Sequence, residues 1–246
     1  MNIPQTQTAD VSVKSFHPNT VYTAGDFPGY TIQHALAMYP TSWKEAAKHF
    51  GVVLPNNTVD FNAVKKIEQI KHNAIEQGIW DFYPTPATVI QKMIDAAKVQ
   101  PYHRVLEPSA GTGDLSNAIA KITNRIDCYE INRNLQTTLT LQGFNLLGSN
   151  FLASPPQPIY DRILANPPFS NHGVNLHTRH AFKFLKPGGR LVTLSHHYKL
   201  KPSQSDKQFF TWLKDHKAKF LNLGQAFKHS DRQTNALIQL IAIDKP

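Results

Sequence analysis

The chain has 246 residues, of which 41% are hydrophobic and 10% aromatic, so it is long and apolar enough to bury a substantial core. No apolar run approaches the roughly 20 residues that span a bilayer, and the N-terminus lacks the pattern of a secretory signal, so we expect a cytoplasmic protein with no membrane partner. The single cysteine, Cys128, excludes an internal disulfide, and the scattered histidines show no metal-ligand spacing, so we expect no bound metal.

The net charge of +9 is concentrated in the last third of the chain. Residues 1–80 carry six Lys or Arg and six Asp or Glu, residues 81–170 carry seven of each kind, and residues 171–246 carry thirteen and four. A basic segment attracts polyanions such as nucleic acid, although a solvated lysine-rich surface has the same composition. The candidate phosphate contacts in this segment are Lys199, Lys201, Lys207, Lys228 and Arg232.

Residues 1–79 are interpreted as an N-terminal arm followed by a helical extension. Residues 1–30 are polar and rich in turn-forming residues, which predicts a loose arm. Helices are expected at 41–50, which opens with capping-box spacing and ends before a glycine, and at 64–77. The first of these helices resembles the first half of a helix-turn-helix. A DNA-reading role is therefore weighed against a helical cap that packs on the following domain, and the cap is favoured.

Residues 80–246 form the second predicted domain, in which short strands alternate with helices. This alternation predicts an α/β fold with a doubly wound, mostly parallel sheet whose two faces are covered by helices. Two further segments near the C-terminus, 224–229 and 236–243, predict an antiparallel hairpin at the edge of that sheet. The other predicted strands are 104–107, 126–130, 144–147, 161–165 and 190–194, and the predicted helices are 87–97, 115–122, 134–142 and 180–185.

The segment Glu107-Pro-Ser-Ala-Gly-Thr-Gly-Asp114 follows a predicted strand and opens a helix. Its glycines, Gly111 and Gly113, let the backbone bend sharply and approach a ligand, and Glu130 ends the next strand, where a carboxylate binds ribose hydroxyls. A simple turn and a surface acid are the alternative. Glu107 at the end of the first strand would repel a pyrophosphate and suits an ammonium or sulfonium group, which indicates S-adenosylmethionine as the cofactor.

A second motif, Asn166-Pro-Pro-Phe169, follows the strand that ends at Ala165. Two prolines fix two φ angles and remove two backbone donors, so the strand must stop in a stiff, extended turn. A plain strand terminator would look the same, but the cofactor loop upstream favours a functional role.

These motifs, in this order, resemble the class I S-adenosylmethionine-dependent methyltransferases, and within them the N6-adenine-specific DNA methyltransferases. The resemblance spans about residues 80–246 and also includes Phe82-Tyr-Pro-Thr-Pro86, which is similar to the segment that covers the methionine moiety, and Lys186-Pro-Gly-Gly-Arg190, which is similar to the turn before the fifth strand. It implies a Rossmann-like sheet of seven strands with an antiparallel last strand. Protein glutamine methyltransferases are also similar, but they usually have Tyr at the position of Phe169.

The resemblance implies roles for individual residues. Asn150 stands where the family often has Asp, and its side-chain oxygen can still accept a hydrogen bond from the adenine amino group, without charge assistance. The implied cofactor-binding residues are Tyr83, Thr85, Glu107, Ser109, Gly111, Gly113, Asp114, Glu130, Ile131, Asn150 and Phe151.

The catalytic residues implied by the resemblance are Asn166, Pro167, Pro168 and Phe169. The Asn166 side-chain oxygen and the Pro167 carbonyl accept the hydrogens of an exocyclic amino group, the prolines hold these acceptors still, and Phe169 stacks on a flipped base. Phe227 is interpreted either as a second aromatic clamp for that base or as a core side chain. The implied substrate contacts are Phe227, Lys199 and Lys228.

The sequence therefore predicts an enzyme that methylates N6 of adenine in nucleic acid, with DNA favoured over RNA. The alternatives are an RNA adenine or guanine N-methyltransferase, a protein glutamine methyltransferase, and a regulatory module that binds a nucleotide without catalysis.

Overall fold

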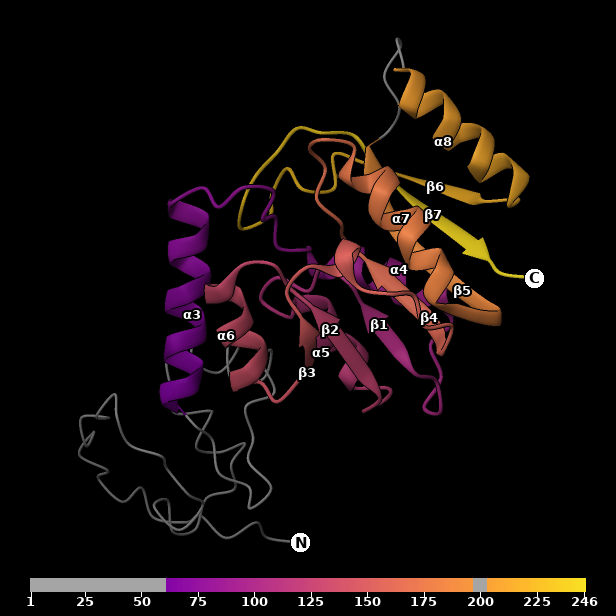
Figure 1. The fold of residues 1–246 in the computed structure, drawn as a ribbon. Helices are drawn as coiled ribbons and strands as arrows, with labels where there is room; N and C mark the ends of the chain where they lie inside the picture. The colour runs from indigo at the N-terminus through magenta and orange to yellow at the C-terminus, as the bar shows by residue number, and fades with distance from the viewer. Residues whose placement is uncertain (1–60, 197–202) are drawn as a thin grey trace, which may run out of the picture.

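The computed structural model describes residues 61–196 and 203–246, and it shows one seven-stranded sheet with helices on both faces (Figure 1). The predictions for residues 1–60, including the arm and the helix at 41–50, and the contact assigned to Lys199 lie outside the described residues. None of the described helices is both long and apolar enough to span a bilayer.

The strand order is β3-β2-β1-β4-β5-β7-β6, in which β7 runs antiparallel to both β5 and β6 and the other pairings are parallel. The predicted α/β fold, a mostly parallel seven-stranded sheet with an antiparallel last strand, is confirmed. The strands are β1 (Val105–Glu107), β2 (Ile126–Tyr129), β3 (Asn145–Gly148), β4 (Tyr160–Ala165), β5 (Leu185–His196), β6 (Lys219–Gly224) and β7 (Ile238–Asp244).

Two hydrophobic layers sandwich the sheet, because neighbouring residues on a strand point to opposite faces. On β1, Val105 belongs to the layer under α4, α5 and α6, whereas Leu106 belongs to the layer under α7 and α8. On β4, Leu164 belongs to the first of these layers and Ile163 to the second. The helices are α3 (Phe61–Glu76), α4 (Ala87–Ala97), α5 (Asp114–Ala120), α6 (Arg133–Leu141), α7 (Gly173–Phe184) and α8 (Gln204–Asp215).

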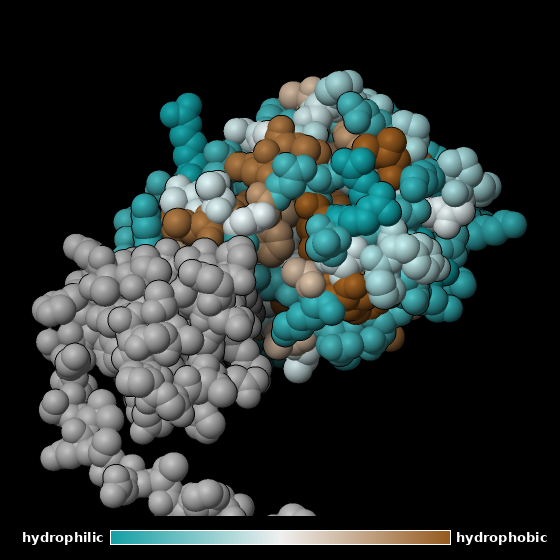
Figure 2. All heavy atoms as spheres, turned by 90° about the horizontal axis from the view of Figure 1, so that it is seen from below, coloured by the Kyte–Doolittle hydropathy of each residue, from teal (hydrophilic) through white to brown (hydrophobic). Residues whose placement is uncertain are grey.

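Helix α3, from the predicted N-terminal extension, lies beside α6 at the end of the sheet that carries β3 (Figure 1). Its Ala74 packs with Phe82 and with Leu135 of α6 in a small hydrophobic cluster. Seen from below, the described surface is mainly hydrophilic, and hydrophobic residues form small separate patches (Figure 2).

Near the C-terminus, one predicted strand is wrong and two observed elements, β6 and α8, were not predicted. The strand predicted at 224–229 is wrong, because Gly224 has a φ of 62° and ends β6, and the chain then turns. Strand β6 precedes it and was not recognised because most of its residues are exposed, as is usual at a sheet edge, so they lack alternation. Helix α8 was also not among the predicted elements, although Ser203 and Asp206 form a capping box at its start.

Candidate active site

The candidate active site lies at the carboxyl ends of the parallel strands, where open α/β sheets bind their ligands. Glu107 ends β1, Glu130 follows β2 and Asn166 follows β4, and all three line one cavity of about 730 Å³. Segments 79–85 and 149–152 complete much of its wall. The volume is in the range of small-molecule sites.

Ten of the eleven predicted cofactor residues line this cavity, namely Tyr83, Thr85, Glu107, Ser109, Gly111, Asp114, Glu130, Ile131, Asn150 and Phe151. Gly113 does not line it. Its φ is 84°, and a Cβ atom there would lie 3.1 Å from Cδ2 of Leu139 on α6. Gly113 therefore allows the start of α5 to pack closely against α6, which is a structural requirement for glycine.

The glycine loop and Glu130 are joined by a hydrogen bond that shapes the cavity floor. The backbone N–H of Gly111 donates to Oε2 of Glu130 at 2.7 Å, and the N–H of Asn132 donates to Oε1 at 2.8 Å. Burial raises the pKa of Glu130, and these backbone donors oppose that rise. Each carboxylate oxygen can accept more than one hydrogen bond, so Glu130 keeps acceptor capacity for a ligand in the cavity that it lines.

Glu107 is 2% exposed, yet its carboxyl group lines the cavity. Burial raises its pKa well above the usual value, and a hydrogen bond from the Ser116 hydroxyl opposes this. A buried carboxyl group with a raised pKa gains most from a cation placed beside it, since the cation stabilises the ionised form. The position therefore suits a positively charged part of a ligand.

Asn150 and Ile131 lie on another part of the cavity wall. The Asn150 side-chain oxygen accepts from the backbone N–H of Leu152 at 3.1 Å and so caps the short 3₁₀ turn η2 (Phe151–Ala153). Ile131 is 72% exposed, which gives this wall an open apolar surface. Phe151 is buried behind it, against Tyr129.

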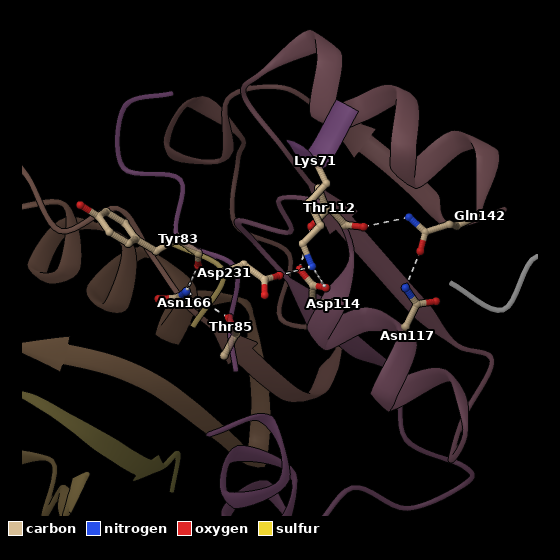
Figure 3. A network of polar contacts seen from close by, with 9 residues as sticks. All are labelled: Lys71, Tyr83, Thr85, Thr112, Asp114, Asn117, Gln142, Asn166 and Asp231. Atoms are coloured by element: carbon tan, nitrogen blue, oxygen red, sulfur yellow. Dashed lines mark hydrogen bonds and ion pairs between the residues drawn. The ribbon is translucent and has the colours of Figure 1, made fainter. Parts of the chain in front are cut away.

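The side chain of Asn166 is fixed in one orientation by two hydrogen bonds to the segment before α4 (Figure 3). Its Nδ2 donates to the carbonyl oxygen of Tyr83 and to Oγ1 of Thr85, each at 3.0 Å. Its Oδ1 is buried and has no hydrogen-bond partner. An unpaired buried acceptor costs about 1–3 kcal/mol, and Asn166 lines the cavity, so a molecule bound there with a suitable donor would recover this energy.

The rest of the tetrapeptide is held from both sides. Pro167 is buried and Pro168 lines the cavity. Helix α7 begins at Gly173, where a Cβ atom would lie 2.3 Å from the carbonyl oxygen of Pro168, so only glycine fits. On the other side, Ser170 donates to the Asp81 carboxylate from its backbone N–H and its hydroxyl. These contacts make the loop rigid.

A second cavity of about 280 Å³ adjoins the first, and Asp81 and Tyr83 line both. Phe169 lines the second cavity and packs edge-on against His196, with ring centroids 4.6 Å apart. Phe227 is buried in the core and also lines this cavity. Its position is therefore compatible with a core side chain and with an aromatic clamp, the two interpretations drawn from the sequence. The tetrapeptide thus stands between a large cavity and a small aromatic one.

Some contacts at the site were not predicted from the sequence, which gave no role to Lys71 and named Arg232 only as a candidate phosphate contact. Lys71 of α3 bridges Asp114 at 3.1 Å and Asp231 at 2.9 Å (Figure 3). Arg232 donates to the carbonyl oxygens of residues 79 and 82 and lies over the Tyr83 ring, 4.5 Å from its centroid. These contacts attach the β6–β7 connection to the cavity wall.

His177 is another unpredicted cavity residue. It lies on α7, with Nδ1 3.2 Å from Oγ of Ser109, and burial lowers its pKa to about 4, which keeps the imidazole neutral. No motif marks it in the sequence. Lys228 is exposed and lines neither cavity. Within residues 61–196 and 203–246, no three His, Cys, Asp or Glu side chains gather as a metal site.

No protein-family model and no curated protein matches the sequence. Solved structures do match the fold. Phosphoethanolamine N-methyltransferase 2 from Haemonchus contortus has a TM-score of 0.54 and 11% identity, over 73% of this chain and 58% of that one. Geranyl diphosphate C-methyltransferase from Streptomyces coelicolor A3(2) has a TM-score of 0.52 and 14% identity, over 65% of this chain and 76% of that one. With the strand order, these likenesses show that the chain has the class I methyltransferase fold.

Proposed function

We propose that the protein transfers a methyl group from S-adenosylmethionine to the exocyclic N6 of adenine in nucleic acid, with DNA favoured over RNA. The observation that carries this proposal is the buried, unpaired Oδ1 of Asn166, held on a rigid loop between two cavities. Asn166 lines the large cavity and Phe169 the small one, so an amino group that reaches from the small cavity toward the large one would donate the hydrogen bond that this oxygen lacks.

The residues of the large cavity fit S-adenosylmethionine. Glu130 would accept from the ribose hydroxyls, the buried Glu107 would face the ammonium group, and Ile131 would pack on the adenine. When bound, this cofactor supplies a methyl group on a positively charged sulfur. Geranyl diphosphate methyltransferases of the same fold were solved with S-adenosylhomocysteine or sinefungin, which supports the assignment.

In this proposal the protein contributes position and hydrogen-bond acceptors. The Asn166 oxygen and the Pro167 carbonyl accept the two amino hydrogens and favour a tetrahedral nitrogen whose lone pair is free to react. Tyr83 and Thr85 hold the Asn166 amide so that its oxygen, and not its nitrogen, is presented. After methyl transfer the nitrogen loses its proton readily, so no strong base is required.

The small cavity favours a planar aromatic substrate. Phe169, Phe227 and the His196 imidazole supply ring surfaces there, which suit a base taken out of its stack. The excess of basic residues after 171 supports a polyanionic substrate. An RNA base and a glutamine side chain in a protein are the rival acceptors.

The proposal is tested by incubating the protein with labelled S-adenosylmethionine and, separately, unmethylated duplex DNA, ribosomal RNA and protein extract, followed by nucleoside and amino-acid analysis. We expect label in N6-methyladenosine nucleosides, and more of it from DNA. Label found only in protein, or on cytosine, would overturn the proposal, and label found only in RNA would replace DNA as the substrate.

A further inference from the structure

Trp80 is the most exposed large hydrophobic side chain in the described part of the chain, at 76%. Its indole N–H donates to Oγ of Ser170 at 2.8 Å, and its side chain lies at the rim of the large cavity. Exposed aromatic rings are common, but they are usually free to change rotamer. This ring is tied to the residue that directly follows the catalytic tetrapeptide.

The tether is itself anchored. Ser170 donates to the Asp81 carboxylate through its N–H and its hydroxyl, and Asp81 is the neighbour of Trp80 in the chain. Asp81 has a φ of 57°, a left-handed conformation that is uncommon for residues other than glycine but that Asp tolerates better than most, and it positions the carboxylate toward Ser170. The indole ring is therefore presented to solvent in a fixed place, next to the loop that holds Asn166.

A positively charged side chain is attached to the backbone of the segment that carries this ring. Arg232 donates to the carbonyl oxygens of Ile79 and Phe82, on either side of Trp80 and Asp81. The same guanidinium lies over the Tyr83 ring, 4.5 Å from its centroid, and its hydrogen-bond partners are uncharged, so its charge is available to an anion. An aromatic face beside a cation is the combination that binds single nucleotides, because the base stacks on the ring and the phosphate pairs with the cation.

We propose that Trp80 is a substrate-binding residue on which a nucleobase adjacent to the target base stacks. The choice of a nucleic-acid ligand rests on the proposed function, but the stacking can be measured without any methyl transfer. The ring face would contribute affinity that does not depend strongly on sequence, since every base offers a π-face. The target base itself would occupy the small cavity, and Asp81 lines both this cavity and the large one.

The test measures binding of the full chain to a short single-stranded oligoadenylate and to a strand of the same length without bases. We expect Trp80→Ala to weaken binding to the oligoadenylate about tenfold and to leave binding to the abasic strand unchanged. Trp80→Phe, which keeps a ring but loses the N–H, should retain most of the affinity. The matched control is Tyr102→Ala, because Tyr102 is 69% exposed and precedes β1, at the amino ends of the parallel strands and away from the cavities.

Each other outcome has a definite meaning. Unchanged binding in Trp80→Ala, or an equal loss on both strands, would overturn the stacking role. If Ser170→Ala weakens binding to both strands as much as Trp80→Ala does, the hydrogen bond supports the loop and the ring face contributes nothing, which also overturns it. A loss confined to S-adenosylhomocysteine affinity would assign the ring to the cofactor instead. A wild-type protein that binds bases through Trp80 but methylates no adenine would contradict the proposed function alone.

Discussion

At the amino ends of the parallel strands, charged side chains are paired with each other, whereas the two glutamates at the carboxyl ends, Glu107 and Glu130, form no ion pair within the described part of the chain. The amino-end pairs are Arg104 with Asp127, Lys186 with Asp161, and Arg190 with Asp244. At the carboxyl ends, Glu107 and Glu130 bond to a hydroxyl and to backbone N–H groups, and the Asn166 oxygen has no partner. The charged pairs at the amino ends of the strands therefore stabilise the fold, and the polar groups at the carboxyl ends keep hydrogen-bonding capacity for ligands.

Among the effects on ligand binding and on stability, the largest should come from Glu130 at the carboxyl ends of the strands. Replacing it with alanine removes the carboxylate proposed to hold the ribose, and hydrogen bonds to a charged group contribute about 1.5–3 kcal/mol each. We expect Glu130→Ala to weaken S-adenosylhomocysteine binding about a hundredfold, measured by calorimetry. An affinity within threefold of wild type would show that Glu130 does not contact the cofactor.

Asp127 provides the opposite case. It is 4% exposed and accepts from Arg104, from the Tyr160 hydroxyl at 2.9 Å and from Asn145 at 2.6 Å. Because Arg104 is partly in solvent, we expect Asp127→Ala to lower the free energy of unfolding by about 2–3 kcal/mol, which is less than for a fully buried pair. Denaturant unfolding measures this. Cofactor affinity should stay unchanged below the melting temperature. A loss of affinity without a loss of stability would contradict the separation of stabilising pairs at the amino ends from ligand-binding groups at the carboxyl ends.

A smaller effect should appear as a pH dependence of cofactor affinity. Burial raises the pKa of Glu107, so in the free protein this carboxyl group stays protonated at pH values above its usual pKa. A bound ammonium group would favour the ionised carboxylate at the same pH values. Binding then releases a proton, and affinity should rise with pH by up to about tenfold per unit until it levels off above the raised pKa. Calorimetry in buffers of different ionisation enthalpy measures the proton release.

The matched variant is Glu107→Gln, which keeps the shape and should remove the proton release. The same shift affects folding with the opposite sign. A group whose pKa is raised in the folded state binds its proton more tightly there than in the unfolded chain. Its contribution to stability is therefore complete at low pH and is lost as the pH rises toward the raised pKa. A stability that increases over that range in wild type relative to Glu107→Gln would contradict this assignment.

The sequence predicts the central sheet well because short apolar strands and the loops after them carry local signals. The glycine loop, Glu130 and Asn166 each stand next to a strand end, and parallel topology brings such ends together. The contacts of Asp81 and Arg232 could not be predicted. Asp81 meets Ser170 from 89 positions away and Arg232 meets residue 79 from 153 positions away, with no periodicity that links them.

Gly113 shows a different limit of sequence reasoning. Its place in a glycine loop predicts a ligand contact, but the same residue type is required wherever helices approach closely, and Leu139 lies against it. Edge strand β6 was missed for a related reason, since a strand exposed on both faces has no hydrophobic alternation. The sequence pattern indicates that a glycine is required at a position. Only the packing around it shows whether the requirement comes from a ligand or from a neighbouring helix.

The most direct test of the central claim compares two asparagines. Asn166 and Asn175 each have a buried, unpaired Oδ1 and an Nδ2 that donates to a neighbour, but Asn175 lines neither cavity. Methyl transfer and cofactor affinity should be measured for Asn166→Ala and Asn175→Ala. We expect a loss of about 10²–10³-fold in kcat for Asn166→Ala only, with cofactor affinity preserved. Comparable rates in the two variants would contradict this expectation.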